Sequence, residues 1–378
     1  MKNRNSTLKR IFAGILSVAI VSSLTACSGS ASNTGSASAA AGSTQSTGTA
    51  AATSKAAGKV PLSISGQPYI HALPNIYAQN NGLFDAFNVN LTMYSSGPTQ
   101  NEALASKGWE VGTTGTGGAI LGAAGYNLKI IGFTCGDTNT TDLWVKPDSP
   151  LAKAAKDPQG IYGTAQDWKG KKILCATGTS CQMVLIGTLK HLGLSMNQVN
   201  VVDMSVAQSF PAFKAGQADI VALWSPFGFA AEKEGWVKIA SAKDLGIELP
   251  CLIVASDDAI KNRPEVVQQW LEAYLKSTEA LNKDQTASAK LLFNFEKQQG
   301  IKMDEDASVK EVQNRPFTSI ADNKELFKKD ADGNSKAQEI MLQFADFMIA
   351  QGKLKPEDKK KIIDNGFIDS SFIEKVAS

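Results

Sequence analysis

The sequence predicts an α/β fold with mostly parallel sheets, arranged as one domain inserted into another. Over residues 60–378, short apolar strand patterns alternate with helical patterns, which is typical of α/β proteins. Two extended segments, 141–146 and 252–256, enclose a self-contained block of about a hundred residues, near the usual size of one domain. We therefore expect two crossing strands that join two lobes, with a cleft between the lobes where a ligand binds.

The first 26 residues are typical of a cleaved export signal. Four basic residues among the first ten precede an apolar run over residues 11–24, which is shorter than the roughly twenty residues of a membrane-spanning helix. The run ends in Leu24-Thr-Ala-Cys27, which resembles the lipobox of bacterial lipoproteins. The resemblance implies that Cys27 is lipidated and anchors the chain to the extracytoplasmic face of the cell membrane. A plain secreted protein is the alternative.

Residues 27–58 follow as a tether rather than as part of the fold. After Cys27 they are almost entirely Ser, Gly, Ala and Thr, which bury no core and form flexible linkers. The chain has 38 Lys and Arg and 36 Asp and Glu; the signal holds four of the basic residues and no acidic one, so residues 27–378 have 34 against 36, a net charge of −2. Without a basic stripe, we expect no nucleic-acid partner.

The cysteines and histidines do not have the spacing of a metal site. The folded part has two histidines, His71 and His191, and four cysteines: Cys135, Cys175, Cys181 and Cys251. We expect no metal and no cofactor. Export permits disulfides, so two alternatives stay open: one or two disulfides of undetermined pairing, or free buried thiols.

The first half of the folded part alternates strands and helices in short steps. Apolar alternation predicts strands over residues 61–65, 89–94, 109–113 and 128–134. Helical patterns are expected over residues 74–81, 99–108 and 114–123. Thr99 followed by Glu102 has the spacing of a capping box, which predicts that the second of these helices begins there.

The second half begins with the clearest strand–turn–helix unit. Ile173, Leu174 and Ala176 form an apolar run, and Thr179 with Gln182 forms a second capping-box pattern. Strands are then expected over residues 199–203, 219–224 and 236–240, with a helix over 209–215. Residues 264–282, 285–299 and 335–352 have apolar residues at helical spacing.

Three turns rich in glycine and hydroxyl groups follow predicted strands, at residues 95–100, 113–119 and 177–182. Ligands of open α/β sheets bind at the carboxyl ends of strands, and a helix N-terminus is a seat for an anion. None of the three turns contains a charged residue, so we expect a ligand held by dipoles and hydroxyl groups. The alternative is that they are ordinary strand–helix junctions. None has the spacing of a phosphate-binding loop or a dinucleotide fingerprint.

Aromatic and imidazole side chains near these turns have two interpretations. Trp224 ends a predicted strand, so it is either core or a wall against an apolar part of a ligand. Tyr69 and His71 follow the first strand and are candidates for the cleft. His71 has no carboxylate or nucleophile near it in sequence, which favours a polar loop residue over a catalyst.

Short stretches in a fixed order carry a resemblance to a known family. They are residues 74–84, Ser96-Gly97, 112–118, Asp167-Trp-Lys-Gly-Lys-Lys-Ile173, Gly193-Leu-Ser, 212–219, Leu223-Trp-Ser-Pro226 and Arg263-Pro-Glu-Val-Val267. With the lipobox in front, the chain resembles the nitrate/sulfonate/taurine-type solute-binding proteins of ABC importers, which share their fold with thiamine-precursor synthases.

This resemblance implies a type II periplasmic-binding-protein fold, with mixed sheets flanked by helices and two hinge strands. Lobe 1 would contain residues 59–145 and 252–378, including the C-terminal helices, and lobe 2 residues 146–251. The implied ligand-binding residues are Gln67, Tyr69, His71, Gly97, Pro98, Thr99, Gly115, Thr116, Gly117, Thr177, Gly178, Thr179, Ser180 and Trp224. A zwitterion such as taurine also needs an acid for its amine, and the candidates are Glu102, Asp137 and Asp142.

The expected function is therefore a binding module rather than an enzyme. The cleft of a monomeric lipoprotein would close on a small organic anion or zwitterion and deliver it to an importer permease, by closure about a hinge. A thiamine- or pyrimidine-precursor-binding protein or related enzyme is the alternative from another class, although the chain lacks clustered cysteines for such chemistry. A surface adhesin or orphan sensor with the same fold is the third.

Overall fold

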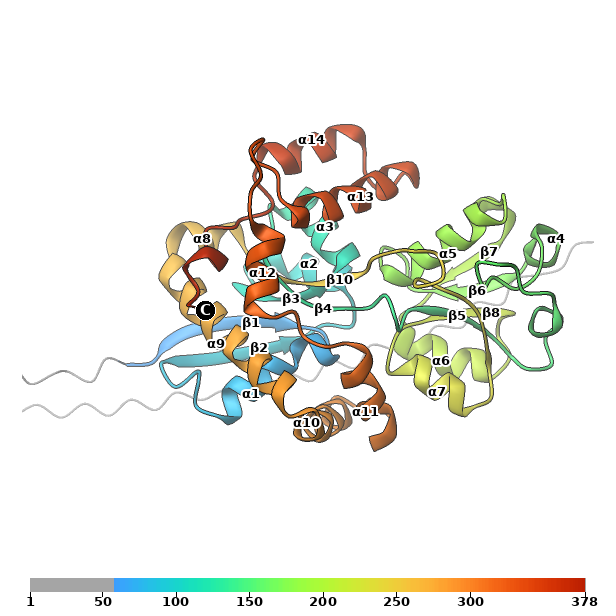
Figure 1. Cartoon of the computed structure of the whole chain (residues 1–378), viewed down its shortest axis with the longest axis horizontal. Coiled ribbons are helices and arrows are strands. Elements are labelled where there is room, and N and C mark those ends of the chain that lie inside the picture. The colour runs from blue at the N-terminus through green and yellow to red at the C-terminus, as the bar shows by residue number, and fades with distance from the viewer. Residues whose placement is uncertain (1–57, 378) are drawn as a thin grey trace, which may run out of the picture. The chain divides into compact units, whose positions relative to one another are not determined.

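The computed structural model describes residues 58–377, and two five-stranded sheets organise them (Figure 1). The predicted signal peptide, Cys27 and residues 28–57 of the tether lie outside the described residues. Within residues 58–377 no helix has both the length and the apolar character needed to cross a membrane.

The first sheet is mixed, as predicted. Strand β1 pairs in parallel with β2 and β3, while β10 runs antiparallel between β3 and β4. Every residue of β10 is buried, which explains why that segment reads as a continuous apolar run without alternation. In spatial order the strands are β2 (Phe87–Met93), β1 (Val60–Gly66), β3 (Val111–Gly115), β10 (Pro250–Ala255) and β4 (Lys129–Gly136).

The second sheet repeats this plan. Strand β6 pairs in parallel with β7 and β8, and β5 runs antiparallel between β8 and β9. In spatial order the strands are β7 (Asn200–Asp203), β6 (Lys172–Cys175), β8 (Ile220–Leu223), β5 (Asp142–Val145) and β9 (Val237–Ser241). We call each sheet with the helices packed on it a lobe.

The chain crosses between the lobes twice, at residues 137–141 and 242–249. The strand after each crossing, β5 or β10, is the antiparallel member of its new sheet, which confirms the two predicted crossing strands. The predicted lobe boundaries are wrong by a few residues. Strand β5 belongs to the second sheet and not to lobe 1, and residues 250–251 belong to the first sheet and not to lobe 2. An apolar run does not reveal which distant strand it pairs with.

Helices cover both sheets (Figure 1). The second lobe has α4 (Ala165–Trp168), α5 (Ser180–His191), α6 (Val206–Lys214) and α7 (Phe227–Lys233). The first lobe has α1 (Leu73–Asn80), α2 (Gly97–Glu102), α3 (Thr116–Tyr126), α8 (Asp257–Asn262), α9 (Pro264–Lys283), α10 (Gln285–Gln298), α11 (Glu305–Asn314), α12 (Ile320–Phe327), α13 (Lys336–Ala350) and α14 (Pro356–Asp364). The three long helices predicted after residue 264 are confirmed as α9, α10 and α13.

Helix α2 begins earlier than the sequence pattern predicted. Its N-cap is Ser96, and Thr99 is the third helical residue, whose hydroxyl accepts a hydrogen bond from the Ser96 backbone N–H at 3.2 Å. The predicted box of Thr99 with Glu102 is therefore wrong. Pro98 at the second helical position has the backbone φ that a helix needs, which favours the earlier start.

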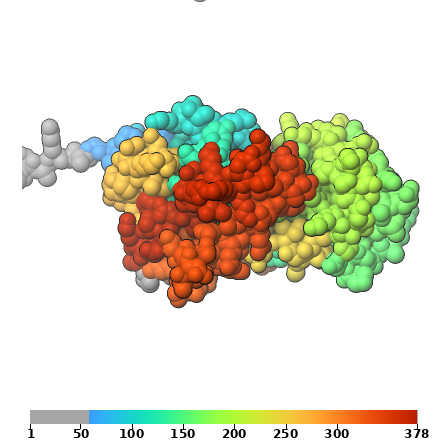
Figure 2. Space-filling view, turned by 90° about the horizontal axis from the view of Figure 1, so that it is seen from above, coloured from blue at the N-terminus to red at the C-terminus, as the bar shows by residue number. Residues whose placement is uncertain are grey.

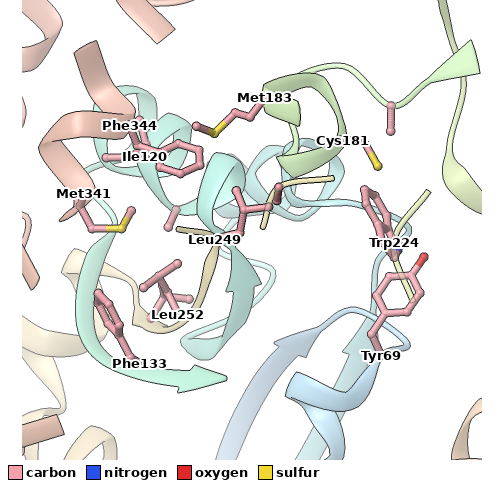
Figure 3. Close-up of a cluster of buried hydrophobic side chains, with 14 of the residues drawn as sticks. Tyr69, Ile120, Phe133, Cys181, Met183, Trp224, Leu249, Leu252, Met341 and Phe344 are labelled. Atoms are coloured by element: carbon pink, nitrogen blue, oxygen red, sulfur yellow. The ribbon is translucent and has the colours of Figure 1, made fainter. Parts of the chain in front are cut away.

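The apolar core extends from one lobe to the other. Met183 of α5 points toward Ile120 of α3 and Phe344 of α13, so side chains of both lobes share one buried cluster (Figure 3). In the space-filling view the C-terminal helices, in red, reach the yellow-green residues of the second lobe (Figure 2). Each large apolar side chain buried there contributes about 1.5–3 kcal/mol.

Candidate functional site

A small cavity of about 30 Å3 lies between the two lobes. The first lobe supplies most of its wall, from segments that follow β1, β3, β4 and α11, and the second lobe supplies the start of α5 and the end of β8. Its lining residues are Gln67, Tyr69, His71, Gly115, Asp137, Ser180, Trp224 and Arg315. Six of these were predicted site residues, Asp137 was a candidate for binding an amine, and Arg315 was missed.

Two helix N-termini from different lobes meet at this cavity. Gly115 is the N-cap of α3, and Ser180 is the first residue of α5. The N-caps, Gly115 of α3 and Thr179 of α5, accept no side-chain capping hydrogen bond. Backbone N–H groups in the first turn of each helix therefore stay available to a ligand. With the positive dipole ends of both helices, this wall attracts an anionic group.

The turn before α5 differs in detail from the predicted capping box. Thr179 is the N-cap as predicted, but its hydroxyl donates to Ala176 O at 2.7 Å and does not cap the helix. Gln182 Oε1 accepts instead from the backbone N–H of Gly178, at 2.7 Å. The side chains of Thr179 and Gln182 therefore hold the turn itself, and Ser180 is the residue of this turn that lines the cavity.

His71 lines the cavity as a neutral imidazole. Burial, together with the charge of Arg315, lowers the pKa of His71 to about 3. Its Nδ1 pairs with Thr113 Oγ1 at 3.1 Å, and this fixes the orientation of the ring. A neutral ring with no carboxylate partner does not have the geometry of a general base activated for catalysis.

Gln67 is held by an amide network at the end of β1. Its Nε2 donates to Gln100 Oε1 and to Thr114 Oγ1, each at 3.0 Å. Gln100 in turn donates to Ser65 Oγ at 2.7 Å. Since all four side chains are buried, satisfied hydrogen bonds lock the side chain of Gln67 beside the cavity.

Tyr69 and Trp224 form an aromatic pair across the two lobes (Figure 3). Their rings are T-shaped, with centroids 5.7 Å apart, which is a favourable edge-to-face geometry. Burial raises the pKa of Tyr69 above its ordinary range, so its hydroxyl stays protonated. Trp224 is both buried and part of the cavity wall, so the two interpretations of this residue are compatible.

Arg315 is the cavity residue that the sequence analysis missed. It follows α11 directly, and its side chain is buried. Nε donates to Gly136 O at 3.1 Å, Nη1 donates to Glu311 Oε1 at 2.8 Å and to Ser225 Oγ at 3.2 Å, and Nη2 forms an ion pair with Asp137. Every guanidinium nitrogen therefore has a protein partner, which fixes the position of the Arg315 side chain. Through its ion pair, the fixed guanidinium in turn holds the carboxylate of Asp137 at the cavity.

The expectation of an uncharged site is therefore wrong for the cavity as a whole, although the three turns are uncharged. The signal for Arg315 was present in the sequence as a pair with Glu311 four residues earlier, the spacing of helical ion pairs. Arg315 and Arg263 are also the only arginines among residues 58–377, and each is followed by proline.

Two buried carboxyl groups lie behind this wall. Glu296 in α10 has neither carboxyl oxygen hydrogen-bonded, and Glu311 has one oxygen without a partner. Burial raises the pKa of both groups, and for Glu296 repulsion from Glu311 adds to the effect. Burial therefore favours the neutral form of Glu296, whereas at Glu311 the ion pair with Arg315 opposes the effect of burial.

The three acids considered for an amine have different environments. Asp137 lines the cavity, whereas Glu102 is exposed at the end of α2. Asp142 lies in a separate polar cavity of about 270 Å3 next to Lys238. Burial raises the pKa of Asp142 to about 7. Of the three, the geometry favours Asp137.

Several predicted site residues form the contact between the lobes and do not line the cavity. A Cβ atom built on Gly117 would lie 2.4 Å from Gly178 O, and one built on Gly178 would lie 3.4 Å from Pro98 Cγ. The main chains of the two lobes therefore approach closely at α3 and α5, and glycine is needed at Gly117 for this approach.

The remaining predicted residues have local structural roles. Gly97 packs closely against α3, and the Thr116 hydroxyl donates to a carbonyl of β10 at 2.6 Å. The backbone N–H of Thr177 donates to Asp203 Oδ1 at 3.0 Å, and Thr99 is exposed.

No disulfide links the four cysteines within residues 58–377 of this structure, so their pairing is not decided by it. All four are buried. Among residues 58–377, no group of three or more His, Cys, Asp or Glu side chains is placed to hold a metal ion.

Comparisons with known proteins agree with this architecture. A family model described as NMT1/THI5 like matches residues 67–288. A putative ABC transporter periplasmic binding protein of Brachyspira hyodysenteriae is 29% identical over 328 residues, covering 85% of this chain and 91% of that protein. The taurine-binding periplasmic protein of Escherichia coli is 25% identical over 203 residues, covering 53% of this chain and 58% of that protein.

A solved structure shows the same fold. The alkanesulfonate-binding protein SsuA from Xanthomonas axonopodis pv. citri, bound to MOPS, aligns with a TM-score of 0.65 and 21% identity, covering 82% of this chain and 98% of that chain. The fold predicted from the sequence, two lobes of mixed sheets with helices, is thus confirmed.

Proposed function

We propose, from the premise that the chain belongs to the NMT1/THI5-like family, that it is the solute-binding component of an ABC importer. Its ligand would be a small organic anion or zwitterion, of the sulfonate or taurine type, captured between the lobes and delivered to a permease. The names of two related proteins support this class: one is a putative ABC transporter binding protein and one binds taurine.

The observation that carries the proposal is a cavity closed by both lobes at two helix N-termini. A cavity needs roughly 10–15 Å3 to hold one water, so a volume of about 30 Å3 has room for two or three waters. An organic ligand is larger than this and does not fit in the cavity as it stands. The lobes must therefore separate to admit a ligand, and the arrangement that closes around the ligand must hold a larger cavity than this one. Such closure about a hinge is how binding proteins commit a ligand to transport.

The polarity of the wall supports the ligand class. The free N–H groups at the starts of α3 and α5 and the hydroxyl of Ser180 would receive the anionic group. Asp137, held in place by Arg315, would accept a hydrogen bond from an amine or hydroxyl group. Tyr69 and Trp224 would pack against the apolar part of the ligand. Nitrate fits only the first of these three subsites.

The proposed location follows from the N-terminal sequence. A lipid on Cys27 and the tether to residue 58 would hold a monomeric binding domain near the extracytoplasmic face of the membrane, within reach of a permease. We propose this arrangement from the lipobox resemblance alone, because these residues lie outside the described part of the chain.

A thiamine- or pyrimidine-precursor-binding protein or a related enzyme is the second candidate. It is favoured by the NMT1/THI5 description and by an aromatic pair able to contact a flat ring. Against catalysis, His71 is neutral and pairs with Thr113, and none of the four thiols lines the cavity.

Thermal unfolding of the full chain tests the proposal. The panel would contain taurine, alkanesulfonates, nitrate, short carboxylates, amino acids and aminopyrimidines, with primary alcohols as uncharged controls. A hundredfold excess of a true ligand over Kd stabilises the folded state by about 2.7 kcal/mol, which raises the unfolding temperature. We expect a shift with sulfonates or taurine. No shift with any anion, combined with turnover of a pyrimidine, would contradict the receptor function.

A further inference from the structure

Cys135 and Cys251 are direct neighbours across the β4–β10 pairing. They are Cα partners in the antiparallel register, and such partners lie about 4.5–5.5 Å apart, within the range that a disulfide spans. Arg315 Nη2 lies within 3.6 Å of both Sγ atoms, so the two sulfur atoms are on the same side of the sheet. No backbone movement is therefore needed to bring the two sulfur atoms together.

The same two thiols both contact Arg315, which lines the ligand cavity. Arg315 Nη2 donates to Cys135 Sγ at 3.6 Å and to Cys251 Sγ at 3.5 Å. This nitrogen also forms the ion pair with Asp137, the acid of the cavity wall. The sulfur pair is thus part of the support that places Arg315 and Asp137.

The other two cysteines lack this arrangement. Cys175 ends β6 and Cys181 is the second residue of α5, so they are not cross-strand partners. The Cys175 thiol donates to Ala176 O at 3.7 Å. Among the four cysteines, Cys135 and Cys251 are the pair that the strand register places directly opposite each other.

We propose that Cys135 and Cys251 form a disulfide when the chain folds in an oxidising compartment, and that this bond lies behind the cavity as a fixed support for Arg315. Each thiol loses its proton, one S–S bond forms, and the two electrons reduce an external disulfide, such as oxidised glutathione or an oxidised thiol–disulfide oxidoreductase, to two thiols.

The bond is expected to form during folding and not afterwards. Both side chains are buried in the folded chain, and the contact with Cys135 together with burial raises the pKa of Cys251. Since the thiolate is the species that attacks a disulfide, the folded reduced protein reacts slowly. The unfolded chain exposes both thiols with ordinary reactivity.

Peptide mapping tests this proposal without any ligand. The full chain would be unfolded, refolded in a mixture of reduced and oxidised glutathione, alkylated and digested for mass spectrometry. We expect one linked peptide pair containing Cys135 and Cys251, with Cys175 and Cys181 alkylated. A parallel sample of folded, reduced chain exposed to the same mixture should stay largely unlinked over the same time.

The control variants are Cys135→Ser and Cys175→Ser. The first should leave Cys251 without an intramolecular partner, and the second should leave the proposed bond unchanged. If refolding fails, the same mapping of exported chain, alkylated at harvest, gives the answer. Four alkylated cysteines in the refolded and exported chain, or a bond at Cys175 or Cys181, would overturn the proposal. Neither result bears on solute binding, so the two proposals fail independently.

A second measurement tests the support given to Arg315. In the linked protein we expect a higher thermal unfolding temperature than after reduction, because the bond joins the two strands next to the crossings. We also expect slower hydrogen exchange over residues 136–141 and 311–315. Equal exchange in the oxidised and reduced protein would overturn the link to Arg315.

Discussion

Ser225 in the second lobe donates a hydrogen bond to Glu311 Oε1 in the first lobe, at 3.1 Å, and accepts one from Arg315 Nη1 at 3.2 Å. A residue next to the cavity wall of one lobe is therefore held by a buried ion pair of the other. On the surface nearby, Lys310 of α11 pairs with Glu232 of α7 at 3.1 Å. Helix α11 thus carries the polar contacts that hold the lobes together on this side.

Ser225→Ala should favour the open arrangement. The substitution removes one hydrogen bond between the lobes, worth about 1 kcal/mol, while Glu311 keeps its bond to Arg315. We expect ligand affinity to fall about fivefold, mainly through faster dissociation, with the unfolding temperature little changed. Stopped-flow dissociation of the ligand found in the thermal screen measures this.

The matched control is Ser288→Ala. Ser288 is buried and donates to Leu281 O at 2.7 Å within the first lobe. This variant should lower stability without changing dissociation. Equal dissociation rates for both variants would show that Ser225 has no role in closure.

Gly117→Ala should also prevent full closure. The added Cβ would meet Gly178 O at 2.4 Å, so the lobes must move apart. Alanine in place of glycine favours the helix itself by about 1 kcal/mol, so folding should not suffer. We expect a larger radius of gyration with ligand, by small-angle scattering, and at least tenfold weaker binding.

Gly125→Ala is the control on the same helix, since a Cβ there meets nothing within 4 Å. It should leave both binding and the radius of gyration unchanged. Should Gly117→Ala bind as tightly as Gly125→Ala, the close approach of the two main chains is not required for function.

Arg315→Ala should destabilise the fold strongly. It leaves the carboxylates of Asp137 and Glu311 buried without their positive partner, and breaking a buried pair costs about 3–5 kcal/mol. Urea unfolding measures the difference. The control is Arg263→Ala, whose ion pair with Glu110 is only partly buried, so its loss should cost much less. A similar loss of unfolding free energy in both variants would argue against strong coupling among Arg315, Asp137 and Glu311.

Asp142 should make stability depend on pH. Its folded pKa of about 7 lies above its unfolded value of about 3.9, so the folded state binds the proton more tightly. This contribution to the free energy of unfolding is fully present below pH about 4 and is lost as the pH rises through 7, with a slope of at most about 1.4 kcal/mol per pH unit.

Asp142→Asn should flatten this part of the stability profile between pH 4 and 8, measured by urea unfolding at each pH. Asp148→Asn, at an exposed position, should keep the slope of the parent chain. An unchanged slope in Asp142→Asn would mean that the Asp142 carboxylate is well solvated or fully neutralised by Lys238.

Local sequence patterns predicted the helices and strands whose apolar residues recur at a regular spacing. The strand–turn–helix unit around Thr179 was found from an apolar run, glycine and a capping pattern, and the long amphipathic helices α9, α10 and α13 from their spacing. Of the six predicted residues that line the cavity, Gly115 and Ser180 belong to turns at strand ends, Tyr69, His71 and Trp224 follow or end predicted strands, and Gln67 was implied by the family resemblance. The exact partners within each turn were not predictable, because Thr179 and Gln182 each had more than one acceptor or donor within reach.

Arg315 shows where local reasoning fails. It comes from a charged segment near the C-terminal end, and its acceptors lie on β4 at Gly136 and in the other lobe at Ser225. Nothing in the neighbouring sequence encodes those contacts. The lobe boundary at β5 failed for the same reason, since its strand partners are distant in sequence.

The sequence by itself determined the α/β class, the two crossings, the N-terminal signal pattern and the strand–turn–helix junctions, because each depends on residues close together along the chain. Only the tertiary structure decided which side chains meet. In the folded chain Gly117 and Gly178 form a contact between the lobes, Arg315 holds Asp137 at the cavity, and Cys135 lies opposite Cys251. These relationships depend on long-range packing and on the desolvation of charges, which arise when distant segments are buried together.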